Sequence, residues 1–365
     1  MSEQIRQTPL RDFHLAHGGR LVPFAGWELP VQYTAILDEH KAVREKAGMF
    51  DVSHMGEVTV EGPQALAFLQ RVLTNDISRI DIGQAIYSLM CYDNGTCVDD
   101  VICYRRDEEK YFICVNASNA AKDIAWMQEK SKGYFCTVAD CCDDYAQIAI
   151  QGPLAWDVVY ASGFDGEAPA RFCAGDARVA GCDVFLSRTG YTGEDGCEIY
   201  CKPGDAMKIA KAIWYAGEPL GLALCGLGAR DSLRLEAGMP LYGHEISDAI
   251  SPLQAGLGWA VKLDKDTDFI GKAALAEEKA RGPERKLLHF TLEGRRIARE
   301  GTAIVDADGN TVGQVRSGSF SPTLGKPIGS ALVNSGADRD SLLVDLRGNK
   351  EKLIPAKAPL HKNAR

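Results

Sequence analysis

The pattern of apolar and polar positions over the first 285 residues mixes helix-like and strand-like periods without a regular βαβ alternation. Helices are predicted over residues 33–47, 64–73, 120–130, 205–215, 228–237 and 271–285, and strands over 57–61, 111–116, 147–151, 179–186 and 197–201. Gly48 is expected to end the first of these helices, because glycine is the commonest residue after a helix C-terminus. The pattern therefore predicts an α+β region over residues 1–275.

The remaining chain has a different pattern. Short apolar runs separated by turns, such as the Asp308-Gly309-Asn310 turn, predict antiparallel strands. Strands of this length and spacing are typical of a small antiparallel barrel. We expect this second domain, a β-barrel, to occupy residues 284–365.

Two adjacent carboxylates, Asp99 and Asp100, stand in an otherwise apolar strand. The Asn-Gly dipeptide at 94–95 predicts a two-residue hairpin turn, which would place Leu89 opposite Asp100 and Tyr87 on the same face as Asp100. A carboxylate held near a phenol in apolar surroundings is a candidate general acid or base. Alternatively, one aspartate caps the turn and the other faces water.

Composition and charge exclude some classes of protein. The chain has 365 residues and a formal net charge of −9, which argues against nucleic acid as the main partner because phosphate binding needs a basic surface. The start of the sequence carries no basic-plus-apolar leader, and the longest apolar stretch, 219–229, is too short to cross a bilayer. These features predict a cytoplasmic enzyme without a membrane segment.

The 12 cysteines show neither a Cys-x-x-Cys motif nor zinc-ligand spacing, so no metal site is predicted. Most are expected to be small apolar core residues, and disulfides are not expected. One alternative stays open, that the vicinal pair Cys141-Cys142, with Cys197 and Cys201, senses redox state or binds a metal.

Three further segments contain candidate chemistry. Glu198 follows a glycine-rich loop and shares a strand face with Tyr200, so it either accepts two hydrogen bonds from an amidine-like edge or belongs to a solvated turn. Arg230 and Arg234 lie four apart on a predicted helix, where they either reach a ligand or form internal ion pairs. His54 lacks an accompanying nucleophile motif and is more simply a structural histidine.

Six segments together resemble the glycine cleavage T-protein family. They are FAGWELPVQY (24–33), GMFDVSHMGEV (48–58), the Asn-Gly hairpin with its two aspartates, RTGYTGEDGCE (188–198), GLGARDSLRLEAGMPLYG (226–243) and SGSFSPTLGK (317–326). The resemblance runs in order from about Thr8 to Pro359. It implies a folate-binding first region of two intertwined α+β subdomains and a C-terminal barrel.

The resemblance also implies a reaction. The family transfers the one-carbon unit of aminomethyl-lipoyl H-protein to tetrahydrofolate, giving 5,10-methylenetetrahydrofolate, ammonia and dihydrolipoyl H-protein. Asp100 matches the catalytic aspartate, Glu198 the acid that holds the pterin edge, and Arg230 an arginine that contacts folate. Five residues match positions that line the pterin and aminobenzoyl pocket: Tyr87, Asn116, Tyr191, Met55 and Trp259.

Two alternative functions stay open. Relatives in the same superfamily use tetrahydrofolate to demethylate other small donors, and other relatives bind folate without transfer chemistry and assist maturation reactions. The latter carry a Lys-Gly-Cys loop where this chain has RTGYTGE at 188–194, which disfavours that hypothesis. The basic cluster Arg295, Arg296 and Arg299 is either a docking surface for an acidic carrier protein or a solvated turn.

Overall fold

The computed structural model describes residues 5–364, which form two compact units. The first unit comprises the chain up to Phe68, Ile77–Tyr87 and Val101–Arg230, and the second comprises Leu69–Asp76, Ser88–Asp100 and the chain from Asp231 onward. The predicted domain boundary near residues 275–284 lies inside the second unit and stays a prediction.

The first unit contains a six-stranded sheet of order β11-β12-β13-β10-β4-β14. Its strands are β4 (Ala47–Asp51), β10 (Ala146–Gln151), β11 (Ala174–Val179), β12 (Cys182–Ser187), β13 (Gly196–Cys201) and β14 (Leu222–Leu224). All neighbours are antiparallel except β14, which runs parallel to β4. A smaller sheet of order β1-β3-β2 consists of β1 (Arg6–Gln7), β2 (Arg20–Phe24) and β3 (Trp27–Gln32).

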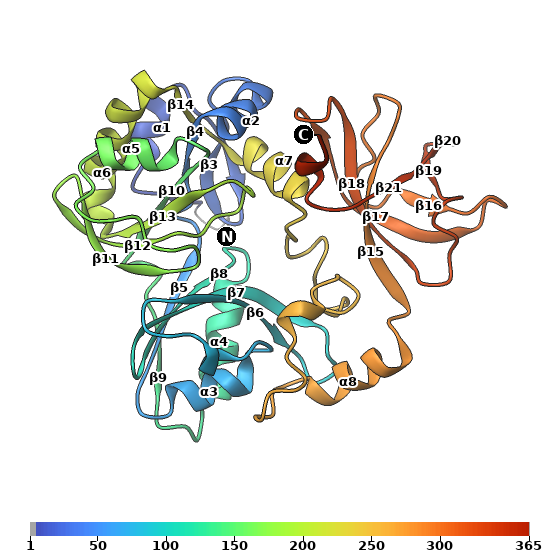
Figure 1. Ribbon diagram of the computed structural model, residues 1–365, viewed down its shortest axis with the longest axis horizontal. Coiled ribbons are helices and arrows are strands. Elements are labelled where there is room, and N and C mark those ends of the chain that lie inside the picture. The colour runs from blue at the N-terminus through green and yellow to red at the C-terminus, as the bar shows by residue number, and fades with distance from the viewer. Residues whose placement is uncertain (1–4, 365) are drawn as a thin grey trace. The chain divides into compact units, whose positions relative to one another are not determined.

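Helices cover the six-stranded sheet (Figure 1). These are α1 (Arg11–Ala16), α2 (Ile36–Glu45), α5 (Ala155–Ala161) and α6 (Pro203–Gly217), followed by the 3-10 turn η2 (Glu218–Leu220). Ile148 and Ile150 of β10 are fully buried in one cluster with Val158 of α5 and Ile209 and Ile213 of α6. This cluster is the main core of the first unit.

A five-stranded antiparallel sheet has the order β6-β7-β8-β5-β9. Its strands are β5 (Gly56–Glu61), β6 (Ala85–Cys91), β7 (Cys97–Asp107), β8 (Lys110–Val115) and β9 (Thr137–Asp140). The accompanying helices are α3 (Ala65–Val72), η1 (Ile77–Arg79) and α4 (Ala120–Lys130). In the first unit, Tyr104 and Phe112 of this sheet pack against Phe185 and Tyr200 of the six-stranded sheet, with the Phe112 and Tyr200 ring centroids 5.1 Å apart. An aromatic core thus lies between the two sheets.

The second unit contains a seven-stranded antiparallel sheet of order β20-β19-β16-β17-β18-β15-β21. Its strands are β15 (Arg285–Thr291), β16 (Ala303–Val305), β17 (Thr311–Ser321), β18 (Lys326–Asn334), β19 (Leu343–Leu346), β20 (Asn349–Lys352) and β21 (Ile354–Ala356). The remaining helices are α7 (Leu227–Ala237), η3 (Gly258–Ala260), α8 (Lys272–Arg281) and η4 (Leu360–Ala364). Buried side chains such as Phe290, Val315 and Val344 fill the sheet's interior. The predicted α+β class with an antiparallel C-terminal sheet is confirmed.

Two predicted elements are wrong in detail. The helix expected over 33–47 ends at Glu45, and Gly48 is not its C-cap but lies inside β4. Glycine is needed there for close packing, since a Cβ would lie 2.4 Å from Val43 Cγ2. The single strand expected over 179–186 is a hairpin, because Ala180 and Gly181 both have positive φ (52° and 71°) between β11 and β12. Two such residues form the type I′ turn that suits a hairpin.

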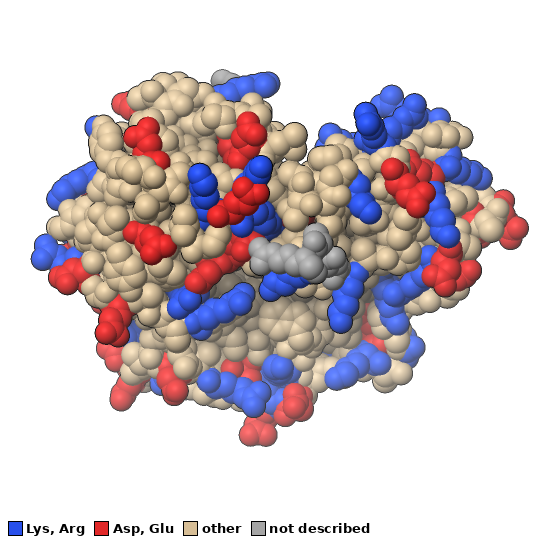
Figure 2. All heavy atoms as spheres, turned by 45° about the horizontal axis from the view of Figure 1, so that its top comes forward, with Lys and Arg blue, Asp and Glu red and all other residues tan. Residues whose placement is uncertain are grey.

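The surface agrees with the composition. On the face shown in Figure 2, acidic and basic side chains are interspersed. Among the described residues, no helix combines the length and apolar character needed to span a membrane.

Candidate functional site

Glu198 is the centre of a polar cluster in the first unit. It lies in β13, partly buried, and its carboxylate accepts hydrogen bonds from Thr189 Oγ1 at 2.5 Å and Gln147 Nε2 at 3.1 Å. Burial raises the pKa of Glu198, and the bond from Thr189, the nearby Arg230 and the bond from Gln147 act in the opposite direction. A carboxylate has about four lone-pair positions. Two hydrogen-bonding positions therefore remain for a ligand with adjacent donors.

Gln147, which bonds to this carboxylate, is itself bonded to Tyr200. The two residues stand directly opposite each other in the pairing of β10 with β13, and Gln147 Nε2 lies 3.2 Å from the Tyr200 hydroxyl. The Tyr104 hydroxyl lies 3.2 Å from both Thr189 Oγ1 and the Tyr200 hydroxyl. The predicted shared face of Glu198 and Tyr200 agrees with this network. Gln147 was missed, although a polar residue within the apolar strand AQIAIQ is the signal that marks it.

The glycine-rich loop before Glu198 owes its composition to close backbone packing. A Cβ on Gly190 would lie 2.0 Å from Gln151 Oε1, and one on Gly196 would lie 2.1 Å from the Ile150 carbonyl oxygen. Two ion pairs neutralise the loop's acids: Arg44 with Glu194 at 2.9 Å and Arg188 with Asp195 at 2.6 Å. The loop is thus a packed structure rather than a solvated turn.

Arg230 lies in the first turns of α7 and contributes positive charge to the same cluster. Its guanidinium carbon is 4.6 Å from the centroid of the Tyr191 ring, a cation–π contact that joins two predicted site residues. Burial, and to a lesser extent the positive charge of Arg230, lower the pKa of His54 to about 3. His54 is therefore neutral at physiological pH, and its ring packs edge-on to Phe24.

The other predicted site residues are divided between the two units. Met55 packs against the aromatic core of the first unit. Tyr87 in β6 and Asn116 after β8 belong to the same unit and are half-buried. Trp259 belongs to the second unit, in η3, and is 59% exposed.

The two aspartates belong to the second unit, and their hairpin differs from the prediction. The Tyr92 N–H donates to the Thr96 carbonyl and the Gly95 N–H donates to the Tyr92 carbonyl, both at 2.9 Å, so the turn encloses three residues rather than two. Gly95 has φ +83°, as a three-residue turn with a bulge requires. The register derived from a two-residue turn is therefore wrong by one residue beside the turn. At the other end of the strand pair, the Arg105 N–H donates to the Gln84 carbonyl, a pairing that agrees with the predicted register. One strand therefore has an extra residue between these two points, and the expected placement of Tyr87 on the face of Asp100 stays a prediction.

Hydrogen bonds that leave the hairpin show which strand carries the extra residue. The Leu89 N–H donates to Thr74 Oγ1 and the Cys97 N–H to the Ser247 carbonyl, so both amides point away from the partner strand. In an antiparallel pair such outward amides belong to residues that face each other without mutual hydrogen bonds. Arg105 bonds inward to Gln84, so the alternation changes within β7, and the extra residue lies there between Cys97 and Arg105. Asp100 is therefore opposite residues 88–89. Asp99 is fully buried, whereas Asp100 is half-buried.

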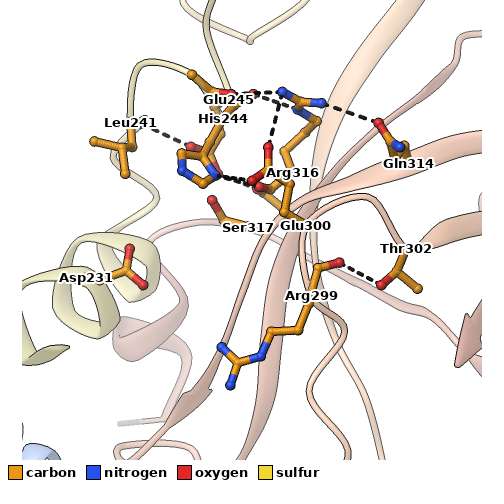
Figure 3. Close-up of polar contacts among 12 residues, drawn as sticks. Asp231, Leu241, His244, Glu245, Arg299, Glu300, Thr302, Gln314, Arg316 and Ser317 are labelled. Carbon is orange, nitrogen blue, oxygen red and sulfur yellow. Dashed lines mark hydrogen bonds and ion pairs between the residues drawn. The ribbon is translucent and has the colours of Figure 1, made fainter. Parts of the chain in front are cut away.

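Arg234, four residues after Arg230, has a structural role instead. Its side chain is buried in the second unit and bonds to Glu245 Oε2 at 2.9 Å and to Ser317 Oγ at 2.7 Å. The internal ion-pair network considered from the sequence therefore holds for Arg234. Neighbouring contacts tie the loop at His244 to Arg316 and Glu300 (Figure 3).

The predicted basic cluster lies near these contacts. Arg295, Arg296 and Arg299 are all exposed. The Arg299 backbone carbonyl accepts a hydrogen bond from Thr302, whereas its guanidinium points away from the contacts drawn in Figure 3. The charge of this cluster is thus presented to solvent.

The cysteines of the described residues are free thiols, most of them buried. All 12 are free, and within residues 5–364 no group of three His, Cys, Asp or Glu side chains is placed to hold a metal ion. Burial raises the pKa of Cys142 to about 12 and also raises that of Cys197. Such thiols carry little thiolate, the reactive form, at neutral pH.

Comparison with known proteins decides the family. A family model described as the GCVT N-terminal domain matches residues 10–265, and one described as the glycine cleavage T-protein C-terminal barrel domain matches residues 285–362. The chain belongs to the glycine cleavage T-protein family. The proposed resemblance is therefore confirmed, as is the barrel nature of the C-terminal domain.

Individual relatives agree with this family. The chain is 46% identical to an aminomethyltransferase of Symbiobacterium thermophilum, covering 100% of this chain and 99% of that protein. It is also 46% identical to an aminomethyltransferase of Bacillus subtilis, covering 97% of each. The crystal structure of glycine cleavage system aminomethyltransferase T from Bartonella henselae is 34% identical over 98% of both chains, with a TM-score of 0.92. The chain is thus an enzyme of the aminomethyltransferase family.

Proposed function

We propose that this enzyme transfers a one-carbon unit from an aminomethylated lipoyl arm of the glycine cleavage H-protein to tetrahydrofolate. The sulfur–carbon bond and the bond from carbon to the amino nitrogen break, and two carbon–nitrogen bonds form on the folate. The two protons released from the folate nitrogens go to the lipoyl sulfur and to ammonia. The products are 5,10-methylenetetrahydrofolate, ammonia and the dihydrolipoyl carrier.

The observation that carries this proposal is the Glu198 cluster. A pterin presents a ring N–H and an amino group side by side, and the two free acceptor positions of Glu198 suit that edge. The bonds from Thr189 and Gln147 hold the carboxylate in one orientation before the ligand arrives. Arg230, stacked on Tyr191, supplies positive charge for an oxygen of the ligand.

Asp100 is the proposed catalytic carboxylate. It accepts a hydrogen bond from a folate nitrogen, orients that nitrogen for attack, and stabilises the cationic carbon that develops as ammonia departs. Its half-buried position supports this role because a carboxylate shielded from bulk water interacts more strongly with a developing positive charge. Tyr87, Asn116, Met55 and Trp259 are proposed to line the folate site.

The basic cluster is the proposed docking surface for the carrier protein. Residues 285–362 contain 13 Lys and Arg against 8 Asp and Glu, although the whole chain has a net charge of −9. A basic region on an acidic protein steers an acidic partner by electrostatic attraction. Replacing Arg295, Arg296 and Arg299 by glutamine should raise KM for the carrier, most at low salt, whereas Arg339→Gln, an exposed control in the same unit, should not.

The cytoplasm is the proposed location. The 12 free cysteines suit a reducing compartment, where thiols do not form disulfides.

A donor-specificity assay tests the proposed function. Purified enzyme is given tetrahydrofolate with either aminomethylated lipoyl carrier or dimethylglycine, and ammonia and methylenetetrahydrofolate are measured. We expect turnover of the lipoyl donor alone. Turnover of dimethylglycine alone would instead assign a demethylase, and folate binding without turnover of either donor would favour a non-catalytic folate-binding protein.

A further inference from the structure

Lys265 is a buried lysine that the proposed reaction does not use. It belongs to the second unit and is only 7% exposed. Its Nζ donates hydrogen bonds to the backbone carbonyls of Leu73 at 2.7 Å, Gln70 at 2.8 Å and Asn75 at 3.0 Å. Gln70 Oε1 lies 3.2 Å from the same nitrogen, and the Phe269 ring lies beside it. One ammonium group thus gathers the carbonyls of a single short segment, residues 70–75.

Segment 70–75 in turn braces β6. The Thr74 N–H donates to the Leu89 carbonyl at 2.9 Å, and the Leu89 N–H donates back to Thr74 Oγ1 at 3.3 Å. The Asn75 N–H donates to Ser88 Oγ at 3.0 Å. The segment therefore behaves as a short extra strand along residues 88–89.

Residues 88–89 connect this brace to the proposed catalytic group. β6 and β7 are neighbours in the sheet, and the hydrogen bonds at the two ends of the strand pair place Asp100 opposite residues 88–89. Residues directly opposite in an antiparallel pair share a face and lie within about 5.5 Å at their Cα atoms. The brace thus acts on the part of β6 that lies beside Asp100 and fixes where the Asp100 backbone sits in the sheet.

We propose that Lys265 is a positioning residue of the transfer reaction, whose ammonium group holds segment 70–75 against residues 88–89 and thereby sets the position of Asp100. The proposal rests on the proposed role of Asp100. It assigns Lys265 no contact with either substrate.

The charge of Lys265 makes the proposal sensitive to pH. Burial lowers the pKa of Lys265 to about 8; Lys272 also lowers it, whereas Asp76 and Asp268 raise it. A neutral amine has two donors and a lone pair, so on deprotonation at least one of the three carbonyls would face that lone pair. The brace should therefore loosen as the pH rises through about 8.

Lys265→Met tests the brace, with Lys272→Met as the matched control. Lys272 Nζ also bonds to two backbone carbonyls, those of Lys265 and Thr267, but not to segment 70–75. We expect Lys265→Met to lower kcat at least tenfold while KM for tetrahydrofolate stays within twofold, and Lys272→Met to change neither. Unchanged kcat in Lys265→Met would overturn the proposal.

A second measurement uses only the wild-type enzyme, in case Lys265→Met does not fold. Lysine ε-¹³C NMR follows the titration of Lys265 while kcat is measured from pH 6.5 to about 9.5. We expect kcat to fall on the alkaline side with the same midpoint as Lys265. A kcat that stays constant through that midpoint would overturn the proposal, whereas wild-type enzyme without any transfer activity would overturn the proposed function instead.

Discussion

Replacing Glu198 by glutamine separates ligand recognition from stability. Two acceptor positions of the carboxylate are occupied by Thr189 and Gln147, which leaves two for the pterin edge. Glutamine keeps one acceptor but places an amino group where the other stood, so one charge-assisted hydrogen bond is lost. Such a bond contributes about 1.5–3 kcal/mol, which corresponds to a Kd for tetrahydrofolate about 10- to 150-fold higher.

The same substitution should not lower stability. Because burial raises the pKa of Glu198, the folded protein holds the ionised side chain less favourably than the unfolded chain does, and this cost grows as pH rises towards neutrality. Glutamine removes that cost. We therefore expect the melting temperature of Glu198→Gln at pH 7 to equal or exceed that of the wild type.

Isothermal titration with tetrahydrofolate, combined with calorimetric melting, measures both quantities. Glu57→Gln is the matched control, because Glu57 is another buried carboxylate whose pKa is raised by burial and it has no assigned role in binding. It should melt no lower than the wild type and keep its folate affinity within twofold. If Glu198→Gln binds tetrahydrofolate within threefold of the wild type, the assignment of the pterin edge is refuted.

Three further outcomes follow from named contacts. The affinity for tetrahydrofolate should fall as pH drops through the raised pKa of Glu198, and a titration of Glu198→Gln from pH 7 to about 5 should show no such fall. Arg234→Met should cost about 3–5 kcal/mol in denaturant unfolding, because it leaves the Glu245 carboxylate buried without its cation. Gly190→Ala should cost about 1–3 kcal/mol in the same assay, because its Cβ would displace Gln151, whose side chain bonds to the loop backbone.

Elements with strong local periodicity could be predicted from the sequence. The helix predicted over 120–130 has these bounds in the structure, and Asp123, Ile124 and Met127 form its buried face at spacings of three and four residues. The helix expected to reach residue 47 stops earlier because Ala47 pairs with Leu222 of β14, a contact 175 residues away in sequence. Pairing in a sheet overrides helix propensity at this position, and a pairing with so distant a strand cannot be predicted from the local sequence pattern.

The candidate site divides in the same way. Glu198 and Arg230 stand out as charged residues beside glycines, whereas Gln147 acquires its role only from a carboxylate 51 residues later in the chain. The Asn-Gly dipeptide gives the position of the hairpin but not its register, because a two-residue and a three-residue turn both use that glycine. The role of Lys265 could not be predicted from the local sequence either, since its four oxygen partners lie about 190 residues earlier in the chain.

The most direct test of the central claim is single-turnover transfer by Asp100→Asn. The substitution keeps the shape of the side chain and removes its charge. The enzyme is mixed with aminomethylated lipoyl carrier and tetrahydrofolate, and methylenetetrahydrofolate is followed, with Kd for tetrahydrofolate measured separately. We predict a rate lower by about 10²- to 10⁴-fold, the usual contribution of a positioned acid–base group, with Kd within threefold of the wild type. A wild-type transfer rate in Asp100→Asn would contradict the account.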